Sequence, residues 1–120
     1  MKLIDYLIKL RDRYVYRQVK RIVLPQVESS KLIREHVFFS GRVQNVGFRY
    51  EVFLLARKLG LTGWVKNLKD GSVESMFQGE KNKIDFLIEF MQSLSRAKVK
   101  KLSRVEIELV TNEIQFSMNE

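Results

Sequence analysis

The residues best suited to chemistry lie in one short run, from Phe39 to Arg49. An apolar stretch ends near Gly41, a short loop follows, and Arg49 stands where a helical pattern begins. Backbone N–H groups at a helix start carry about half a positive charge through the helix dipole. The Arg49 guanidinium would add a cation with a planar fork of donors. The run therefore predicts a site for a phosphate group, the alternative being a turn whose glycines only permit tight geometry.

A second run, from Gly63 to Gly79, contains one residue in an unusual place. Asn67 falls within a predicted strand, where Asn is disfavoured, and such an exception often marks a functional position. The alternative is that Asn67 lies at the end of a hairpin and its side chain hydrogen-bonds nearby backbone groups. Asp70-Gly71 is a strong turn signal between two apolar runs, so this segment is expected to form a hairpin.

The overall composition removes several kinds of chemistry. The 120 residues include no cysteine and one histidine, which excludes disulfides, thiolate zinc sites and a cysteine nucleophile. His36 is interpreted as an ordinary residue at a strand end. The net charge is +8, but residues 1–34 hold nine Lys or Arg against three acids, and residues 35–120 hold thirteen against eleven. The basicity thus belongs mainly to the N-terminal segment, and no nucleic acid partner is expected.

The elements that must position these residues form an extension and one small domain. Residues 2–24 predict a helix with one apolar and one basic face, which ends at Pro25. Arg11 and Gln18 interrupt its apolar face. A connector follows, with the domain boundary near residue 34. Strands are expected over residues 36–43, 63–68, 71–78 and 105–109, a short edge strand over 114–118, and helices over 48–59 and 84–94.

This order predicts an α+β fold of the ferredoxin-like, split βαβ type (βαββαβ). Four or five antiparallel strands would form the sheet, with two helices on one face. Residues 1–34 would be a basic amphipathic helical extension and connector, and residues 35–120 the compact domain. The extension could lie on an anionic membrane, associate with a second copy or pack on its own domain. The architecture alone does not decide function.

The two runs together resemble the signature motifs of the acylphosphatase family, small enzymes that hydrolyse the carboxyl–phosphate bond of acyl phosphates. Phe39 to Arg49 matches the family's first motif except at Asn45, where the family has glycine. Gly63 to Gly79 meets every fixed position of the second motif, and the similarity covers residues 36–118. If position 45 needs a positive φ, Asn is the least costly substitute. The C-terminus lacks the family's Arg-Tyr pair, which is expected to affect strand packing more than chemistry.

The resemblance implies hydrolysis of a small acyl phosphate to a carboxylate and inorganic phosphate, with phosphate as product or inhibitor and with no cofactor or metal. It implies that Arg49 binds the phosphoryl group and that Asn67 orients the attacking water. The implied phosphate-binding loop consists of Val43, Gln44, Asn45, Val46, Gly47 and Phe48. The substrate's own phosphate could accept the proton, because the sequence offers no general base suited to the task.

Several other functions stay open at this point. A related domain could keep the phosphate site without turnover, and a ferredoxin-like module could bind RNA through aromatic residues on its sheet. The candidates for such a face are Phe38, Phe39, Trp64 and Phe77. A unit of a larger carbamoyl-transfer enzyme is a further alternative. We expect a cytoplasmic protein, peripheral to a membrane if residues 1–24 bind lipid.

Overall fold

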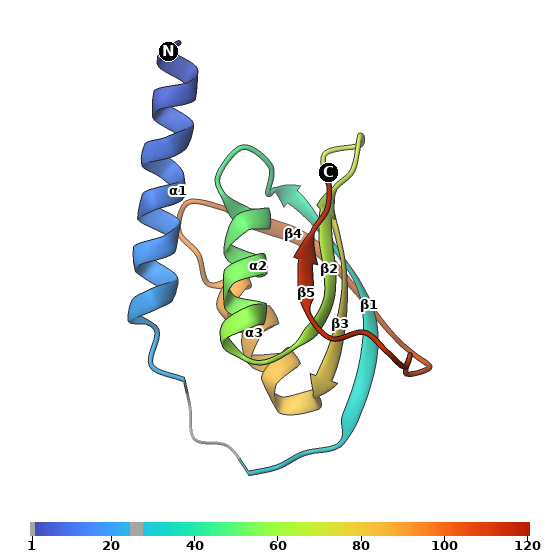
Figure 1. The fold of residues 1–120 in the computed structure, drawn as a ribbon. Coiled ribbons are helices and arrows are strands. Elements are labelled where there is room, and N and C mark those ends of the chain that lie inside the picture. The colour runs from blue at the N-terminus through green and yellow to red at the C-terminus, as the bar shows by residue number, and fades with distance from the viewer. Residues whose placement is uncertain (1, 25–27) are drawn as a thin grey trace.

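The computed structural model describes residues 2–24 and 28–120, and its elements follow the predicted order. The helices are α1 (Leu3–Arg21), α2 (Phe48–Lys58) and α3 (Lys81–Gln92). The strands are β1 (Leu32–Arg42), β2 (Thr62–Asn67), β3 (Val73–Glu80), β4 (Lys98–Ile107) and β5 (Phe116–Met118). From β1 to β4 the order is βαββαβ, which confirms the predicted fold class, with α1 before it and β5 after it (Figure 1).

The five strands form one sheet in the order β4-β1-β3-β2-β5. β1 pairs antiparallel with β3 and β4, and β2 pairs antiparallel with β3. β5 instead runs parallel to β2, so the prediction of an antiparallel sheet is wrong for this strand. The reason is topological. β4 ends beside the start of β1, where Ile107 faces Arg34, and a chain that crosses from there to the far edge must run in the direction of β2.

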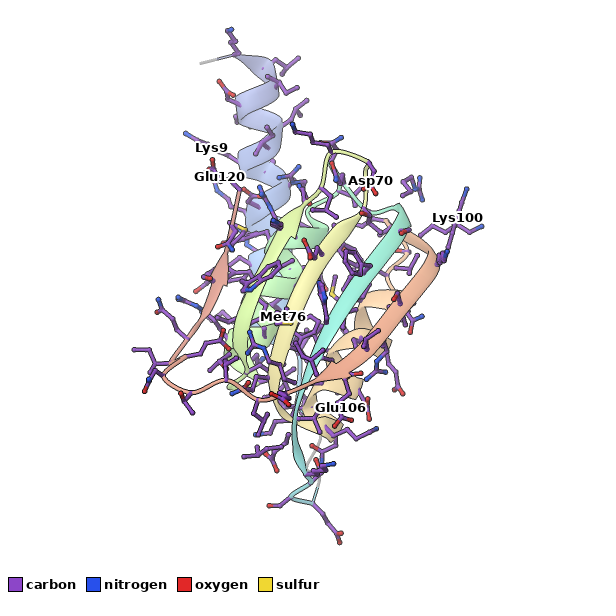
Figure 2. All side chains as sticks on the ribbon, turned by 90° about the vertical axis from the view of Figure 1, so that its right-hand side faces the viewer. Lys9, Asp70, Met76, Lys100, Glu106 and Glu120 are labelled. Atoms are coloured by element: carbon purple, nitrogen blue, oxygen red, sulfur yellow. The ribbon has the colours of Figure 1, made fainter. Side chains whose placement is uncertain are left out.

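The helices α2 and α3 cover one face of the sheet, and the other face is open (Figures 1 and 2). Apolar residues at helical spacing bury α2 and α3 against the inward side chains of the strands. Of the four aromatic candidates for an RNA-binding face, Phe39 and Phe77 are fully buried in this core. His36 lies on the open face within β1, rather than at a strand end, and its Nε2 is 2.7 Å from Glu74 Oε2.

Several element ends differ from those predicted. β1 begins at Leu32, four residues early, because Ile33 is buried and this stretch pairs with β3. β4 begins at Lys98 and ends at Ile107, which leaves Leu109 outside the strand. α1 ends at Arg21, since the next residue has an extended backbone. Pro25, predicted to end that helix, lies outside the described residues.

The extension packs on its own domain through the second half of α1. Val15 and Val19 are 0% and 4% exposed and belong to the core. Lys58 Nζ, at the end of α2, donates to the carbonyl oxygens of Val19 (3.0 Å) and Lys20 (3.2 Å). Val19 O also accepts from Ile22 N at 3.1 Å, and the Lys58 cation adds a further donor where the helix runs out of its own and where the helix dipole is negative. α1 is therefore held against α2 at its C-terminal end.

The first half of α1 projects past the rest of the domain (Figure 1). Leu3, Ile4 and Leu7 are 72%, 63% and 52% exposed. Within the described part of the chain, neither this helix nor any other combines the length and apolar character needed to cross a bilayer.

Candidate active site

The loop between β1 and α2 has the backbone that the glycine-rich motif predicts. Within residues 43–47, Asn45 has φ 66° and Gly47 has φ 79°, both in the left-handed region. The sequence left open whether position 45 needs a positive φ, and in the structure Asn45 adopts this glycine-like conformation. Asn tolerates this region better than other residues with a Cβ, and the strain costs on the order of 1 kcal/mol.

The same loop leads into a helix start that can receive an anion. Gly47 precedes α2 and no side chain caps the helix, so its first N–H groups have no partner inside it. Left-handed residues beside right-handed ones turn successive N–H groups toward one side, a concavity that binds anions. Phe48 is 1% exposed and lies edge-on to Phe39, with ring centroids 5.1 Å apart. The helix start is therefore anchored in the core.

Arg49 and Asn67 line the same hollow, which has a volume of about 480 Å³. The loop, the β2–β3 turn and the C-terminal end of the chain all lie at one end of the sheet (Figure 1). The hollow is lined by Ile8, Arg11, Asp12, Val43, Gln44, Asn45, Gly47, Phe48, Arg49, Tyr50, Asn67 and Met118. The structure thus brings the predicted site residues together, with the exception of Val46. That side chain packs against the core.

Asn67 is the last residue of β2, and its side chain has an unusual environment. Its Oδ1 is buried and has no hydrogen-bond partner in the protein. A buried acceptor left unpaired costs about 1–3 kcal/mol. The hairpin-end explanation of Asn67 gains no support, because Asp70 Oδ1 performs that task by accepting from Ser72 N (2.9 Å) and Ser72 Oγ (2.6 Å).

The Gln44 side chain ties the loop to the β2–β3 turn. Its Nε2 donates to the carbonyl oxygens of Leu68 (2.7 Å) and Ser72 (2.9 Å), one on each side of the turn. The hydroxyl and N–H of Ser72 hold the pKa of Asp70 below its usual value, because they donate to its charged form. The sequence motif contains Gln44, but only the fold reveals what its side chain binds.

The C-terminal segment reaches Arg49. Arg49 Nη1 donates to the carbonyl oxygen of Asn119 at 2.9 Å, and Asn119 N donates to Val65 O at 2.8 Å. Met118 lines the hollow. The sequence predicts that the C-terminus affects strand packing more than chemistry, and this stays a prediction, but the segment does contact the Arg49 guanidinium. The alternation of residues 114–118 predicts a strand but does not predict its neighbour.

Arg96, which lies outside both motifs, binds the loop backbone at Val46 and the buried Glu51 on α2. Arg96 Nε donates to Val46 O at 2.8 Å, and Arg96 Nη2 forms an ion pair with Glu51 Oε1. Glu51 is fully buried on α2. Burial raises the pKa of Glu51, while the hydrogen bond and charge of Arg96 act in the opposite direction. The Arg96 guanidinium also lies 5.6 Å from the ring centroid of Tyr14 on α1. No sequence signal marks this arginine.

The extension forms one wall of the hollow, which the sequence did not predict. A Cβ on Gly47 would lie 2.8 Å from Val15 Cγ2 and 3.4 Å from Arg11 Cγ, so α1 approaches the loop backbone closely. Arg11 Nη2 lies 3.2 Å from Asp12 Oδ1. Burial raises the pKa of the Tyr50 hydroxyl, and the charge of Asp12 adds to this effect. The one available signal was Arg11, which interrupts the apolar face of the helix.

Comparison with known proteins gives a consistent result. The family model Acylphosphatase matches residues 35–118. The acylphosphatase of Trichormus variabilis (strain ATCC 29413 / PCC 7937) is 47% identical over 79 residues, which are 66% of this chain and 78% of that protein. The acylphosphatase crystal structure from Bacillus subtilis matches with a TM-score of 0.69 and 35% identity, over 73% of this chain and 99% of that one.

Similarity also extends to part of a much larger protein. The HypF structure from T. kodakarensis matches with a TM-score of 0.64 and 29% identity, over 73% of this chain but only 12% of that one. Residues 2–24, which include α1, precede the segment that the family model matches.

Proposed function

The chain belongs to the acylphosphatase family, and from this premise we propose how its own residues hydrolyse an acyl phosphate. Arg49 and the loop N–H groups hold the phosphoryl group, and Asn67 positions the attacking water. The observation that carries this proposal is the buried, unpaired Oδ1 of Asn67, in the same hollow as Arg49 and the loop. The products are a carboxylate and inorganic phosphate.

The loop and Arg49 supply what phosphoryl transfer chiefly needs, which is position and compensating charge. Left-handed backbone at Asn45 and Gly47 and the uncapped start of α2 favour an anion at this point. A guanidinium has five N–H donors. One nitrogen of Arg49 is oriented by Asn119 O, and the remaining donors can bind phosphate oxygens and neutralise the charge that develops on them.

Asn67 acts on the water. Its Oδ1 accepts a hydrogen bond from the water and so directs a lone pair of the water oxygen toward phosphorus, in line with the bond to the acyl oxygen. The water oxygen bonds to phosphorus as the bond from phosphorus to the acyl oxygen breaks, and the carboxylate leaves with the electron pair. The proton passes to a phosphate oxygen. Because a carboxylate is a good leaving group, this step requires no protein acid.

Hydrolysis of acetyl phosphate by Arg49→Ala tests the proposal. Removing the guanidinium should lower kcat/KM on the order of 10³-fold, the scale of an arginine in phosphoryl transfer, and should abolish inhibition by inorganic phosphate. Arg42→Ala is the matched control, because Arg42 is an exposed arginine at the end of β1 and does not line the hollow. Full activity in Arg49→Ala would exclude this role.

A further inference from the structure

A second hollow adjoins the first along α1. Its volume is about 320 Å³, and it is lined by Ile4, Leu7, Ile8, Arg11 and Asn45. Ile8, Arg11 and Asn45 line both hollows. The outer hollow therefore begins where the phosphate site ends, and it leads away along the first turns of the helix.

The wall of the outer hollow is an apolar strip that the fold leaves exposed. Ile4, Leu7 and Ile8 are 63%, 52% and 40% exposed. They stand at the spacing i, i+3, i+4, which places their side chains on one face of a helix. The core contacts of α1 lie further along, at Val15 and Val19. Adjacent exposed apolar side chains mark a binding surface more often than isolated ones do.

The strip lies on the side of the site where in-line attack by a water held at Asn67 would place the leaving acyl group. α2 contacts both α1 and β2, and Figure 1 shows these two elements on opposite sides of it. In-line attack places the leaving group opposite the water. If Asn67 at the end of β2 holds the water, the acyl group leaves on the side of α1.

We propose that the strip Ile4–Leu7–Ile8 binds the acyl group of the substrate, and that the enzyme prefers acyl phosphates with an apolar chain of several methylenes over acetyl phosphate. This inference rests on the function proposed above. One molecule with an anionic head and an apolar tail would fill both adjoining hollows. A membrane surface would contact the strip but would leave the shared wall at Asn45 unused.

The test compares kcat/KM for octanoyl phosphate and acetyl phosphate, both as soluble monomers. A fully buried methylene contributes about fourfold to affinity, and six methylenes on an open strip should together favour octanoyl phosphate by about tenfold. Leu7→Ser should lower this preference severalfold. Leu10→Ser is the matched control, because Leu10 is a 40% exposed leucine of the same helix that lines neither hollow. It should keep the wild-type preference.

Two results would overturn the inference and leave the proposed function intact. One is hydrolysis of both substrates with equal kcat/KM. The other is an equal loss of the preference for octanoyl phosphate in Leu7→Ser and Leu10→Ser. Hydrolysis of neither substrate would overturn the proposed function, and this inference with it. Vesicles containing phosphatidylglycerol provide the remaining arm. If Leu7→Ser abolishes binding to them while the substrate preference is unchanged, the strip is a membrane contact and the inference is wrong.

Discussion

The helices α1 and α2 lie side by side, yet they depend on the rest of the molecule to very different degrees. α2 has 11 residues and buries Phe48, Glu51, Val52, Leu55 and Ala56. α1 has 19 residues and buries only Val15 and Val19. The family model matches the segment that contains α2 and not the one that contains α1. The comparison shows that α2 lies in the family segment and is integral to its core, whereas α1 precedes that segment and is buried through two side chains only.

After Arg49→Ala, the largest effect is expected in the compact domain, at Asn67. Asn67→Ala should lower kcat by about 10²- to 10³-fold, the scale for one positioning group in a transition state, while inhibition by phosphate is retained. Steady-state kinetics with inorganic phosphate as inhibitor would measure both. Asn82→Ala is the control, because Asn82 Oδ1 is also buried and unpaired but lies on α3. If the Asn82 variant loses as much kcat, the loss at Asn67 is structural.

Gln44→Ala should have the next largest effect. Without the bonds to Leu68 O and Ser72 O, the loop and the turn can separate, and a displacement near 1 Å costs on the order of 10²-fold in rate. We expect kcat to fall by about tenfold to a hundredfold, as measured with acetyl phosphate. Wild-type kcat in Gln44→Ala would mean that the core alone holds the two segments in register.

Val15→Ala and Val52→Ala sharpen the comparison directly, because both side chains are 0% exposed, one on α1 and one on α2. Each substitution removes two methyl groups, and burying two groups of this size stabilises the folded state by about 2 kcal/mol. Val52→Ala should lower the free energy of unfolding in urea by about this amount, and Val15→Ala by about 1 kcal/mol, because α1 can shift to close the gap. Equal losses would show that α1 is as integral to the fold as α2.

The smallest effect concerns the pH dependence of stability at Glu51. Burial raises the pKa of this carboxyl above its ordinary value, against the opposing hydrogen bond and charge of Arg96. The stability that the protonated Glu51 carboxyl contributes to the folded state is therefore fully present below the ordinary pKa of glutamate. It is lost as the pH rises through the raised pKa. Glu51→Gln should gain stability relative to wild type as the pH rises from about 4 to 8. Urea midpoints that keep a constant difference would contradict this.

Local patterns were sufficient to predict the elements and the two motifs, since both depend on residues close in sequence. Helical spacing on α2 and α3 and the Asp70-Gly71 turn agree with the structure. The direction of β5 and the early start of β1 depend on which strands become neighbours.

The contacts that surround the site were not predictable in the same way. Gln44 and Arg96 each act on a segment at least 24 residues away, and no local pattern encodes such a partner. The close approach of Val15 and Arg11 on α1 to Gly47 likewise exists only in the assembled fold.

The Gln44 amide has a consequence for protein engineering. Its two bonds connect residues 24 and 28 positions apart, so the loop and the turn form one transplantable unit rather than two independent motifs. Grafting only residues 39–49 onto another βαββαβ scaffold should produce an anion receptor. A working hydrolase would also need the β2–β3 turn, with the carbonyl oxygens of Leu68 and Ser72 within hydrogen-bond distance of the grafted Gln44 amide.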